Sequence, residues 1–397
     1  MRSEPDDRAR PLVLVSANTA WNLAHFRREL VEALLADGYR VGAVAPEDGE
    51  SSAALRAMGC VFFPVALDSA GAHPLRDLAT FLALRRILRA ERPVAWLSWT
   101  IKPNIYGAIA ARLAGVAAFP NVSGLGTLFI RRTILTRLAC TLYRLAFLRC
   151  PRVFFQNGDD CALFVRMRLV RAEQTQVLAG SGIDLVRFQP PPVHVPGRRF
   201  LLVARLLADK GVREFVAAAR DLRSEWPDAR FILMGAADVE NRTAIPLDEV
   251  RGWEGEGAIE WRAPEPDVRP AMAAADWIVL PSYREGMSRV LLEALAMGRP
   301  IVTTNVPGCR DVVDEGENGF LAECRDVASL TAALRRAGTV DPAQWQAMAR
   351  SSRAIAERRF SVATVIDAYR AVVAAAAAAV TGASHSPVTA IFEKDHR

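Results

Sequence analysis

Several features are missing from the 397-residue sequence, and each absence excludes a class of protein. No run of apolar residues reaches the roughly 18 that a membrane-spanning helix needs, and the alanine-rich tract 371–380 is too short to span a bilayer. The charged residues 1–10 precede an apolar segment, 11–17, that is shorter than most signal-peptide cores. We therefore expect a cytoplasmic protein with a flexible N-terminus over residues 1–10.

The sequence also lacks the patterns of metal and nucleic-acid sites. Its six cysteines form no C-x-x-C pair and have no histidine partner at metal spacing, which predicts small buried residues in a reducing compartment. Aromatic residues make up 8% of the chain and do not interleave with the basic residues, so we expect no nucleic-acid partner. The net charge of +6 indicates an anionic partner without identifying it.

The pattern that is present is an alternation of short apolar strands and amphipathic helices. It predicts an α/β protein with parallel sheets, and the length suits two domains. Residues 189–198, with four prolines and a glycine, separate the two series. The expected strands are 11–17, 40–45, 61–65, 94–98, 152–156, 199–204, 230–235, 258–262, 277–280 and 301–304, with one further short strand between the helix 105–114 and the loop 121–127. The first expected helix carries Leu23 to Leu34 and runs up to Asp37-Gly38. The other expected helices are 51–58, 76–90, 105–114, 131–149, 158–167, 210–225, 267–275, one from about 289, 309–314, 327–338, 342–357 and 361–380.

The predicted domains follow from these elements. An N-terminal Rossmann-like domain covers 11–186, a linker covers 187–198, and a C-terminal Rossmann-like domain covers 199–380. The helix 361–380 is free to pack back on the N-terminal domain. After residue 381 no periodic pattern remains, and we expect a disordered tail over 381–397.

The most informative stretch is 281–298, PSYREGMSRVLLEALAMG, which follows a buried-type strand. Ser288 is the expected N-cap of the helix that begins near residue 289. Glu285 lies in the loop and Glu293 lies one to two turns into the helix, while Gly286 permits close approach of a ligand to the backbone. Two carboxylates beside a helix N-terminus predict a site for sugar hydroxyls and a phosphate.

This block, continued by the loop VPGCRD, resembles the donor site of retaining glycosyltransferases of family four, which have the two-domain GT-B fold. The resemblance extends over about residues 11–375 and implies two Rossmann-like domains that face each other across a cleft. It also implies that Glu293 accepts the ribose hydroxyls of a nucleotide and that Glu285 meets hydroxyls of the transferred sugar. The alternative is that both glutamates are ordinary surface residues.

Arg205 and Lys210 match the pair of cations that binds the donor diphosphate in this family. Arg205 ends a predicted strand and Lys210 opens the next helix, so both are expected at the same sheet edge as Glu285. No D-x-D triplet is present, and we expect no metal and no other cofactor. The predicted catalytic residues are Glu285, Lys210 and Arg205. The predicted donor-binding residues are Arg205, Lys210, Gly235, Glu285, Gly286, Met287, Ser288 and Glu293.

In the N-terminal half, the stretches IKPNIYG and SGLGT resemble a narrower subgroup, the capsular and O-antigen transferases that extend a sugar on a polyprenyl diphosphate. Many family members carry a histidine near residue 100 and this chain has none there, so no histidine-assisted step is expected. Either asparagine of NTAWN (18–22) is alternatively a helix cap, and the segment 100–104 is alternatively a buried turn. The acceptor-binding residues implied are Asn18, Asn22, Thr100, Lys102, Asn104, Gly124 and Gly126.

Residues 131–171 contain nine arginines and only two acidic residues. Within the helix 131–149, five apolar side chains share one face, and Arg137 and Arg144 lie about 100° away from it. Such a helix can lie on an anionic membrane, or its apolar stripe can pack on the protein's own sheet. A lipid-linked acceptor gives the first alternative equal weight with the second, and the expected location is peripheral at the inner face of the cell membrane.

Together these patterns and the resemblance predict a metal-independent glycosyltransferase, and the resemblance implies that the enzyme retains the configuration at the transferred sugar. The expected donor is a UDP-sugar, with an N-acetylhexosamine favoured, and the expected acceptor is a polyprenyl-diphosphate-linked saccharide of surface polysaccharide synthesis. The alternatives are a UDP-sugar epimerase of the same fold and an inactive scaffold in a polysaccharide assembly complex.

Overall fold

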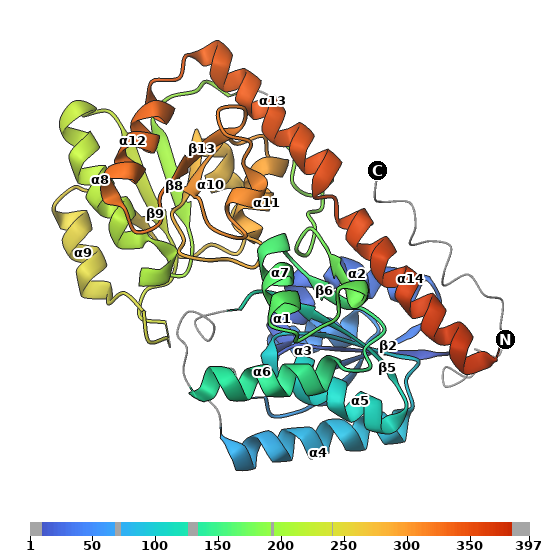
Figure 1. Ribbon diagram of the computed structural model, residues 1–397. Coiled ribbons are helices and arrows are strands. Elements are labelled where there is room, and N and C mark those ends of the chain that lie inside the picture. The colour runs from blue at the N-terminus through green and yellow to red at the C-terminus, as the bar shows by residue number, and fades with distance from the viewer. Residues whose placement is uncertain (1–9, 68–72, 126–133, 192–193, 240, 383–397) are drawn as a thin grey trace. The chain divides into compact units, whose positions relative to one another are not determined.

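The computed structural model describes residues 10–67, 73–125, 134–191, 194–239 and 241–382, and the chain divides into two compact units (Figure 1). The first unit runs to Leu178 and resumes at Ala363, and the second is Ala179–Val362. The chain therefore crosses between units before the predicted boundary at 186. The predicted flexible N-terminus and the tail beyond 382 lie outside the described residues, apart from Arg10.

The first unit is built on a seven-stranded parallel sheet in the order β3-β2-β1-β4-β5-β6-β7. Five of these strands were predicted, one was anticipated without a boundary, and β7 was missed because its three residues show no apolar alternation. The strands are β1 (Leu12–Ser16), β2 (Arg40–Ala45), β3 (Val61–Pro64), β4 (Ala95–Trp99), β5 (Ala117–Val122), β6 (Val153–Phe155) and β7 (Thr175–Val177).

Both faces of this sheet are covered by helices, because alternate residues of each strand point to opposite sides. In β1, Val13 and Val15 pack in one core and Leu12 and Leu14 pack in another. The Val13 core is closed by α1 (Ala20–Phe26), α2 (Arg28–Ala36), α3 (Glu50–Ala57) and α14 (Val362–Thr381). The Leu12 core is closed by α4 (Pro74–Glu91), α5 (Ala108–Ala114), α6 (Ile134–Phe147) and α7 (Gly158–Arg166).

Two predicted helices of this unit are interrupted. The expected helix that carries Leu23 to Leu34 is two helices, because Arg27 leaves the helical region at φ −123° and ψ 9°. The expected helix 105–114 begins as a π-helical turn, Pro103–Gly107, before α5. Such turns are common at functional sites, and this one follows directly on β4 and Thr100.

Helix α14 belongs to the first unit although it follows the second in sequence. Its Tyr369 is buried against Trp99 and Phe154, and the Tyr369 hydroxyl accepts a hydrogen bond of 2.9 Å from Asn121 Nδ2. By length and composition α14 is apolar enough to cross a membrane. Val365, Val373 and their buried neighbours instead pack it on the sheet of this unit.

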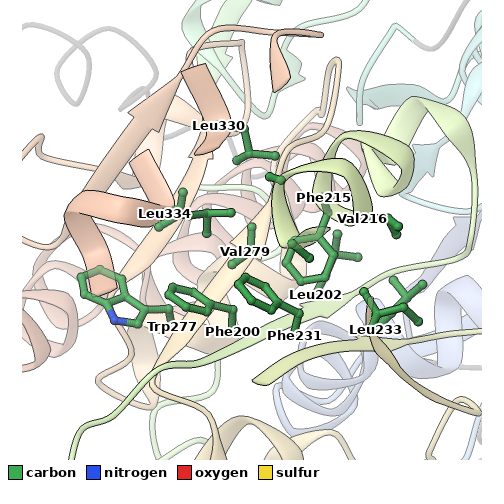
Figure 2. Packing of buried hydrophobic residues seen from close by; sticks show 14 of the residues in the cluster. Phe200, Leu202, Phe215, Val216, Phe231, Leu233, Trp277, Val279, Leu330 and Leu334 are labelled. Atoms are coloured by element: carbon green, nitrogen blue, oxygen red, sulfur yellow. The ribbon is translucent and has the colours of Figure 1, made fainter. Parts of the chain in front are cut away.

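The second unit has a six-stranded parallel sheet in the order β10-β9-β8-β11-β12-β13. Its core on one face stacks Phe200 on Phe231, with ring centroids 5.1 Å apart, beside Trp277 (Figure 2). The strands are β8 (Arg199–Val203), β9 (Arg230–Met234), β10 (Glu260–Arg262), β11 (Trp277–Leu280), β12 (Ile301–Thr304) and β13 (Gly319–Ala322). The helices are α8 (Val212–Glu225), α9 (Leu247–Gly255), α10 (Arg269–Ala274), α11 (Arg289–Ala296), α12 (Val327–Gly338) and α13 (Pro342–Arg359).

Strand β13 and helix α9 were missed in the sequence, and the predicted helix 309–314 is only a 3₁₀ turn, Arg310–Val312. Helix α9 is mostly polar apart from two buried side chains, so its sequence shows no clear helical period of apolar residues. All three elements were predicted wrongly because short elements carry too few positions to establish a period.

The predicted linker 187–198 is also corrected, since its described residues pack on the second unit. His194 Nε2 lies 2.6 Å from the buried Asp276 Oδ1, and Arg199 binds both oxygens of the same carboxylate. Burial of Asp276 alone would raise its pKa, but the hydrogen bonds from His194 and Arg199 lower the pKa to about 2. These contacts of His194 and Arg199 with Asp276 hold the proline-containing segment on the second unit.

Candidate functional site

The second sheet reverses its winding between β8 and β11. From β8 the chain proceeds outward to β9 and β10, and from β11 it proceeds in the opposite direction to β12 and β13. In open parallel sheets, ligands bind outside the carboxyl ends of the two strands at such a switch point. Arg205 and Lys210 follow β8, and Ser282 and Glu285 follow β11, so all four lie at this edge.

The two loops at the switch point contact each other closely. Ser282 Oγ donates to Asp209 O at 3.1 Å, and Tyr283 N donates to the same oxygen at 2.9 Å. Gly211 has a φ of 71°, and a Cβ there would lie 2.0 Å from Pro281 O. Only glycine permits this approach, which brings Lys210 to the end of β11.

Lys210 and Glu285 form the centre of the site. Lys210 Nζ donates to Glu285 Oε1, and Ser282 Oγ lies 2.7 Å from the same oxygen. Both charged side chains are mostly buried, at 23% and 14% exposed. The backbone of Glu285 is held by a 3.1 Å bond from its N–H to Pro307 O and by Gly308, where a Cβ would lie 2.5 Å from Glu285 O.

Arg205 and Gly235 flank this centre. The Arg205 side chain is exposed and makes no hydrogen bond or ion pair within the described residues, so its charge is available to a ligand. Gly235 follows β9, and a Cβ there would lie 1.8 Å from Ala204 O. The absence of a side chain at Gly235 therefore allows the loops after β8 and β9 to pack against each other.

The helix that carries Glu293 begins as predicted. Ser288 is confirmed as the N-cap of α11, with its Oγ accepting from Leu291 N at 3.5 Å. Gly286 is buried, and Met287 is partly buried and packs near Gly180, where a Cβ would lie 2.7 Å from Met287 Cγ.

Glu293 is not the solvated surface residue that the alternative expected. Its side chain is 11% exposed, and Arg289 Nε donates to Glu293 Oε1 at 3.1 Å. Arg289 Nη1 also donates to Ser181 Oγ at 3.3 Å. Burial raises the pKa of Glu293 above the usual range of a glutamate, and the nearby Arg289 offsets part of this effect.

The first sheet has its own switch point between β1 and β4. The N–H of Asn18, after β1, donates to Thr100 Oγ1, after β4, at 3.1 Å. Thr100 has a φ of 69°, which a β-branched residue rarely adopts and which stores conformational strain. Two of the predicted acceptor-binding residues are therefore in direct contact.

Neither asparagine of this loop is the cap of α1. Thr19 takes that role, with its Oγ1 accepting from Asn22 N at 3.1 Å. Asn22 Oδ1 is buried and has no hydrogen-bond partner within the part of the chain that the structure describes. An unsatisfied buried acceptor of this kind is rare, and a ligand hydroxyl would satisfy it.

Two other predicted acceptor residues have structural roles. Asn104 is 1% exposed; it accepts from Ser98 Oγ at 2.9 Å and donates to Asn121 O at 2.7 Å, so we remove it from the acceptor-binding set. Lys102 Nζ lies 2.7 Å from Asp77 Oδ1 of α4, with both side chains mostly buried. Lys102 can therefore meet an acceptor phosphate only by leaving Asp77.

Gly124 has a φ of 128°, which suits glycine and agrees with the predicted tight loop. Gly126 lies outside the described residues. No group of three or more histidine, cysteine, aspartate or glutamate side chains suited to a metal ion occurs within the described ranges.

Sequence reasoning missed the supporting residues Ser282, Arg289 and Asp77. Arg289 is four positions before Glu293 on a helix, a spacing that predicts an ion pair and was the available signal. Asp77 is distant in the sequence from Lys102, and no local pattern identifies either Asp77 or Ser282.

Comparison with known proteins defines the class. Residues 197–339 match the family model of glycosyl transferases group 1. The fold of the whole chain is similar to that of Anabaena HepE in complex with UDP-glucose, with a TM-score of 0.75, 20% identity, and coverage of 92% of this chain and 99% of that one. The predicted α/β class with two Rossmann-like units is confirmed.

Two curated relatives extend beyond the matched domain. The chain is 27% identical over 328 residues to a Campylobacter jejuni N,N'-diacetylbacillosaminyl-diphospho-undecaprenol alpha-1,3-N-acetylgalactosaminyltransferase, covering 78% of this chain and 85% of that protein. It is 26% identical over 285 residues to an Escherichia coli UDP-Gal:alpha-D-GlcNAc-diphosphoundecaprenol alpha-1,3-galactosyltransferase, covering 66% and 70%. The protein is a glycosyltransferase, and its residues 197–339 are similar to glycosyl transferases group 1.

Proposed function

We propose that this glycosyltransferase moves a sugar, an N-acetylhexosamine in the favoured case, from a UDP-sugar to a polyprenyl-diphosphate-linked saccharide. The observation that carries the donor part is the convergence of Arg205, Lys210 and Glu285 at the switch point of the second sheet. The acceptor part is supported by the two relatives, whose names describe transfer to diphospho-undecaprenol-linked sugars.

The diphosphate of the donor is proposed to bind Lys210 and the exposed Arg205. A nucleoside diphosphate competes with Glu285 for the Lys210 ammonium, and Glu285 is then released toward sugar hydroxyls. Glu293, held by Arg289, accepts the ribose hydroxyls. The backbone N–H groups around Gly286 and Ser288, at the start of α11, are available to a phosphate of the donor.

The acceptor is proposed to bind the first unit near Asn18, Asn22, Thr100 and Gly124. The strained Thr100 and the unsatisfied Asn22 Oδ1 support this choice. Transfer breaks the bond between the sugar C1 and the UDP phosphate oxygen and forms a bond from C1 to an acceptor hydroxyl oxygen. The hydroxyl proton passes to the leaving phosphate, and the configuration at C1 is retained.

No metal is assigned to the reaction, since two cationic side chains are positioned to offset the charge of the diphosphate. Activity is therefore expected to survive treatment with a chelator. The enzyme is proposed to work at the inner face of the cell membrane, where its lipid-linked acceptor resides, with α6 among the elements nearest the lipid.

The test is an incubation of the protein with a panel of UDP-sugars and a polyprenyl-diphosphate-linked N-acetylglucosamine, with the lipid product analysed by mass spectrometry. Transfer from one donor, lost in Glu285→Gln, supports the proposal. An epimerised UDP-sugar formed without any acceptor would instead identify an epimerase. Binding of UDP with no turnover of any donor would identify an inactive scaffold.

A further inference from the structure

The exposed leucines of the protein gather on one side of the first unit. Of the thirteen large apolar side chains that are exposed among the described residues, seven are leucines. All seven lie on or directly after α4, α5 and α6, the helices that cover the Leu12 face of the first sheet (Figure 1). They are Leu75, Leu78, Leu82, Leu113, Leu138, Leu145 and Leu148, and we call them the leucine surface.

Helix α4 contributes a row of three. Leu75, Leu78 and Leu82 are 81%, 52% and 50% exposed. At about 100° per residue, they fall within an arc of about 60°, and the exposed Arg86 and Arg89 continue the same stripe toward the end of the helix. The opposite side of α4 packs on the core through its buried residues Asp77, Thr80, Leu84 and Leu88.

Helix α6 adds to this surface, but differently from its predicted pattern. Leu138 and Leu145 are exposed, while Tyr143 and Phe147 pack on the sheet. Leu138 and Leu145 of the predicted stripe therefore lie outside the buried face of the helix, although Leu142 packs in part against the core. Leu138 and Leu145 are two turns apart and point outward together.

The charge of the three helices is strongly positive. Their acidic residues within the described chain are Asp77, which is paired with Lys102, and Glu91. Their arginines are Arg76, Arg85, Arg86, Arg89, Arg112, Arg137 and Arg144. Arg144 is committed to the carbonyls of Met167 and Arg168, whereas Arg86, Arg89 and Arg137 are exposed and have no partner within the described ranges.

We propose that the leucine surface, with the row on α4 as its principal part, docks on an anionic lipid bilayer. Exposed leucines beside unpaired arginines fit the boundary between acyl chains and anionic headgroups, where apolar burial and charge attraction act together. A neutral apolar partner would offer no negative charge to these arginines. The biological role of this docking rests on the proposed function. Docking would hold the first unit at the membrane surface that presents a lipid-linked acceptor.

The test is cosedimentation of the purified protein with vesicles, without donor or acceptor. Wild-type protein should pellet with vesicles containing phosphatidylglycerol and much less with pure phosphatidylcholine. Leu75→Ser/Leu78→Ser/Leu82→Ser should lower the partition coefficient at least about tenfold on anionic vesicles, since the apolar transfer is lost. Arg86→Gln/Arg89→Gln should lower it about tenfold or more there and leave the weak binding to neutral vesicles unchanged.

The controls are equally exposed side chains of the second unit. Val186→Ser/Val195→Ser removes two apolar side chains that are 81% and 77% exposed, and Arg251→Gln/Arg358→Gln removes two exposed cations. Both control variants should pellet as wild type does. Hydrogen exchange tests the same surface in the wild-type protein, without any substitution. Residues 74–91 should gain protection when anionic vesicles are added, and α8 should not.

Wild-type binding that the leucine variant retains would overturn the proposal, as would equal binding to anionic and neutral vesicles. A wild-type dimer that this variant converts to a monomer would assign the surface to a second copy of the chain instead. UDP binding by calorimetry separates this result from the proposed function. A leucine variant that binds UDP normally but not vesicles supports the docking surface, whereas wild-type protein that binds vesicles but not UDP refutes only the proposed donor site.

Discussion

Lys210 and Glu285 are 75 residues apart in the sequence and form an ion pair at the carboxyl edge of the second sheet. Each side chain offsets the charge of the other. A donor diphosphate would compete with Glu285 for the same ammonium. The pair therefore links the binding of the donor to the release of the carboxylate that is proposed to meet its sugar.

The first prediction separates these two roles. Glu285→Gln should lower kcat/KM by at least about 100-fold, because hydrogen bonds to a charged acceptor contribute about 1.5–3 kcal/mol each. The same variant should bind UDP as tightly as wild type or tighter, since Lys210 is no longer paired. Lys210→Ala should weaken UDP binding by about tenfold or more. Calorimetry measures the UDP affinity, and initial rates measure kcat/KM. A loss of UDP affinity in Glu285→Gln would contradict the proposal that the diphosphate competes with Glu285 for Lys210.

The second prediction concerns Arg289 and the pKa of Glu293. Burial raises this pKa and Arg289 lowers it, so Arg289→Gln should raise it further. Because the ionised carboxylate is the form that accepts ribose hydroxyls, the acid limb of UDP binding should move to higher pH. Arg289→Lys should fall between the two.

The readout is the UDP dissociation constant measured across the mildly acidic and neutral range. Arg251→Gln, an exposed arginine of the same unit, is the matched control and should leave the profile in place. An Arg289→Gln profile that coincides with wild type at every pH would remove Arg289 from this role.

The third prediction tests the strain at Thr100. Replacement by glycine relieves about 1–2 kcal/mol of left-handed strain and loses one hydrogen bond of about 0.5–1.5 kcal/mol from Asn18. The free energy of unfolding of Thr100→Gly should therefore change little, while transfer to the acceptor should fall. Denaturant unfolding and acceptor KM are the measurements. A large loss of stability with normal transfer would make Thr100 purely structural.

The fourth prediction decides the role of Lys102. Lys102→Met leaves the buried Asp77 without its cation, which should cost about 3–5 kcal/mol of unfolding free energy. Asp77→Asn/Lys102→Met removes both charges and should recover most of that stability. If Lys102 is only structural, the double variant also recovers transfer activity. A stable double variant that stays inactive would show that the ammonium meets the acceptor.

Much of the fold followed from local pattern. Buried parallel strands such as β1 and β11 are short apolar runs, and each was predicted within a residue or two. The N-cap Ser288 was predicted from residue type and position alone. Helix α9 and strands β7 and β13 were missed, since few of their side chains are buried or their run is too short to show a period.

Strand length, helical period and motif spacing are local properties of the chain. They were enough to predict the two α/β series and the donor motif with Glu285 and Glu293, and to exclude cysteine metal patterns. Which side chains are already engaged depends on the assembled fold. The pairing of Lys102 with Asp77, the burial of Asn104, the outward row of leucines on α4 and the packing of residues 194–199 on the second unit all depend on contacts between distant segments. Those contacts form only when the sheets assemble, and no local pattern specifies them.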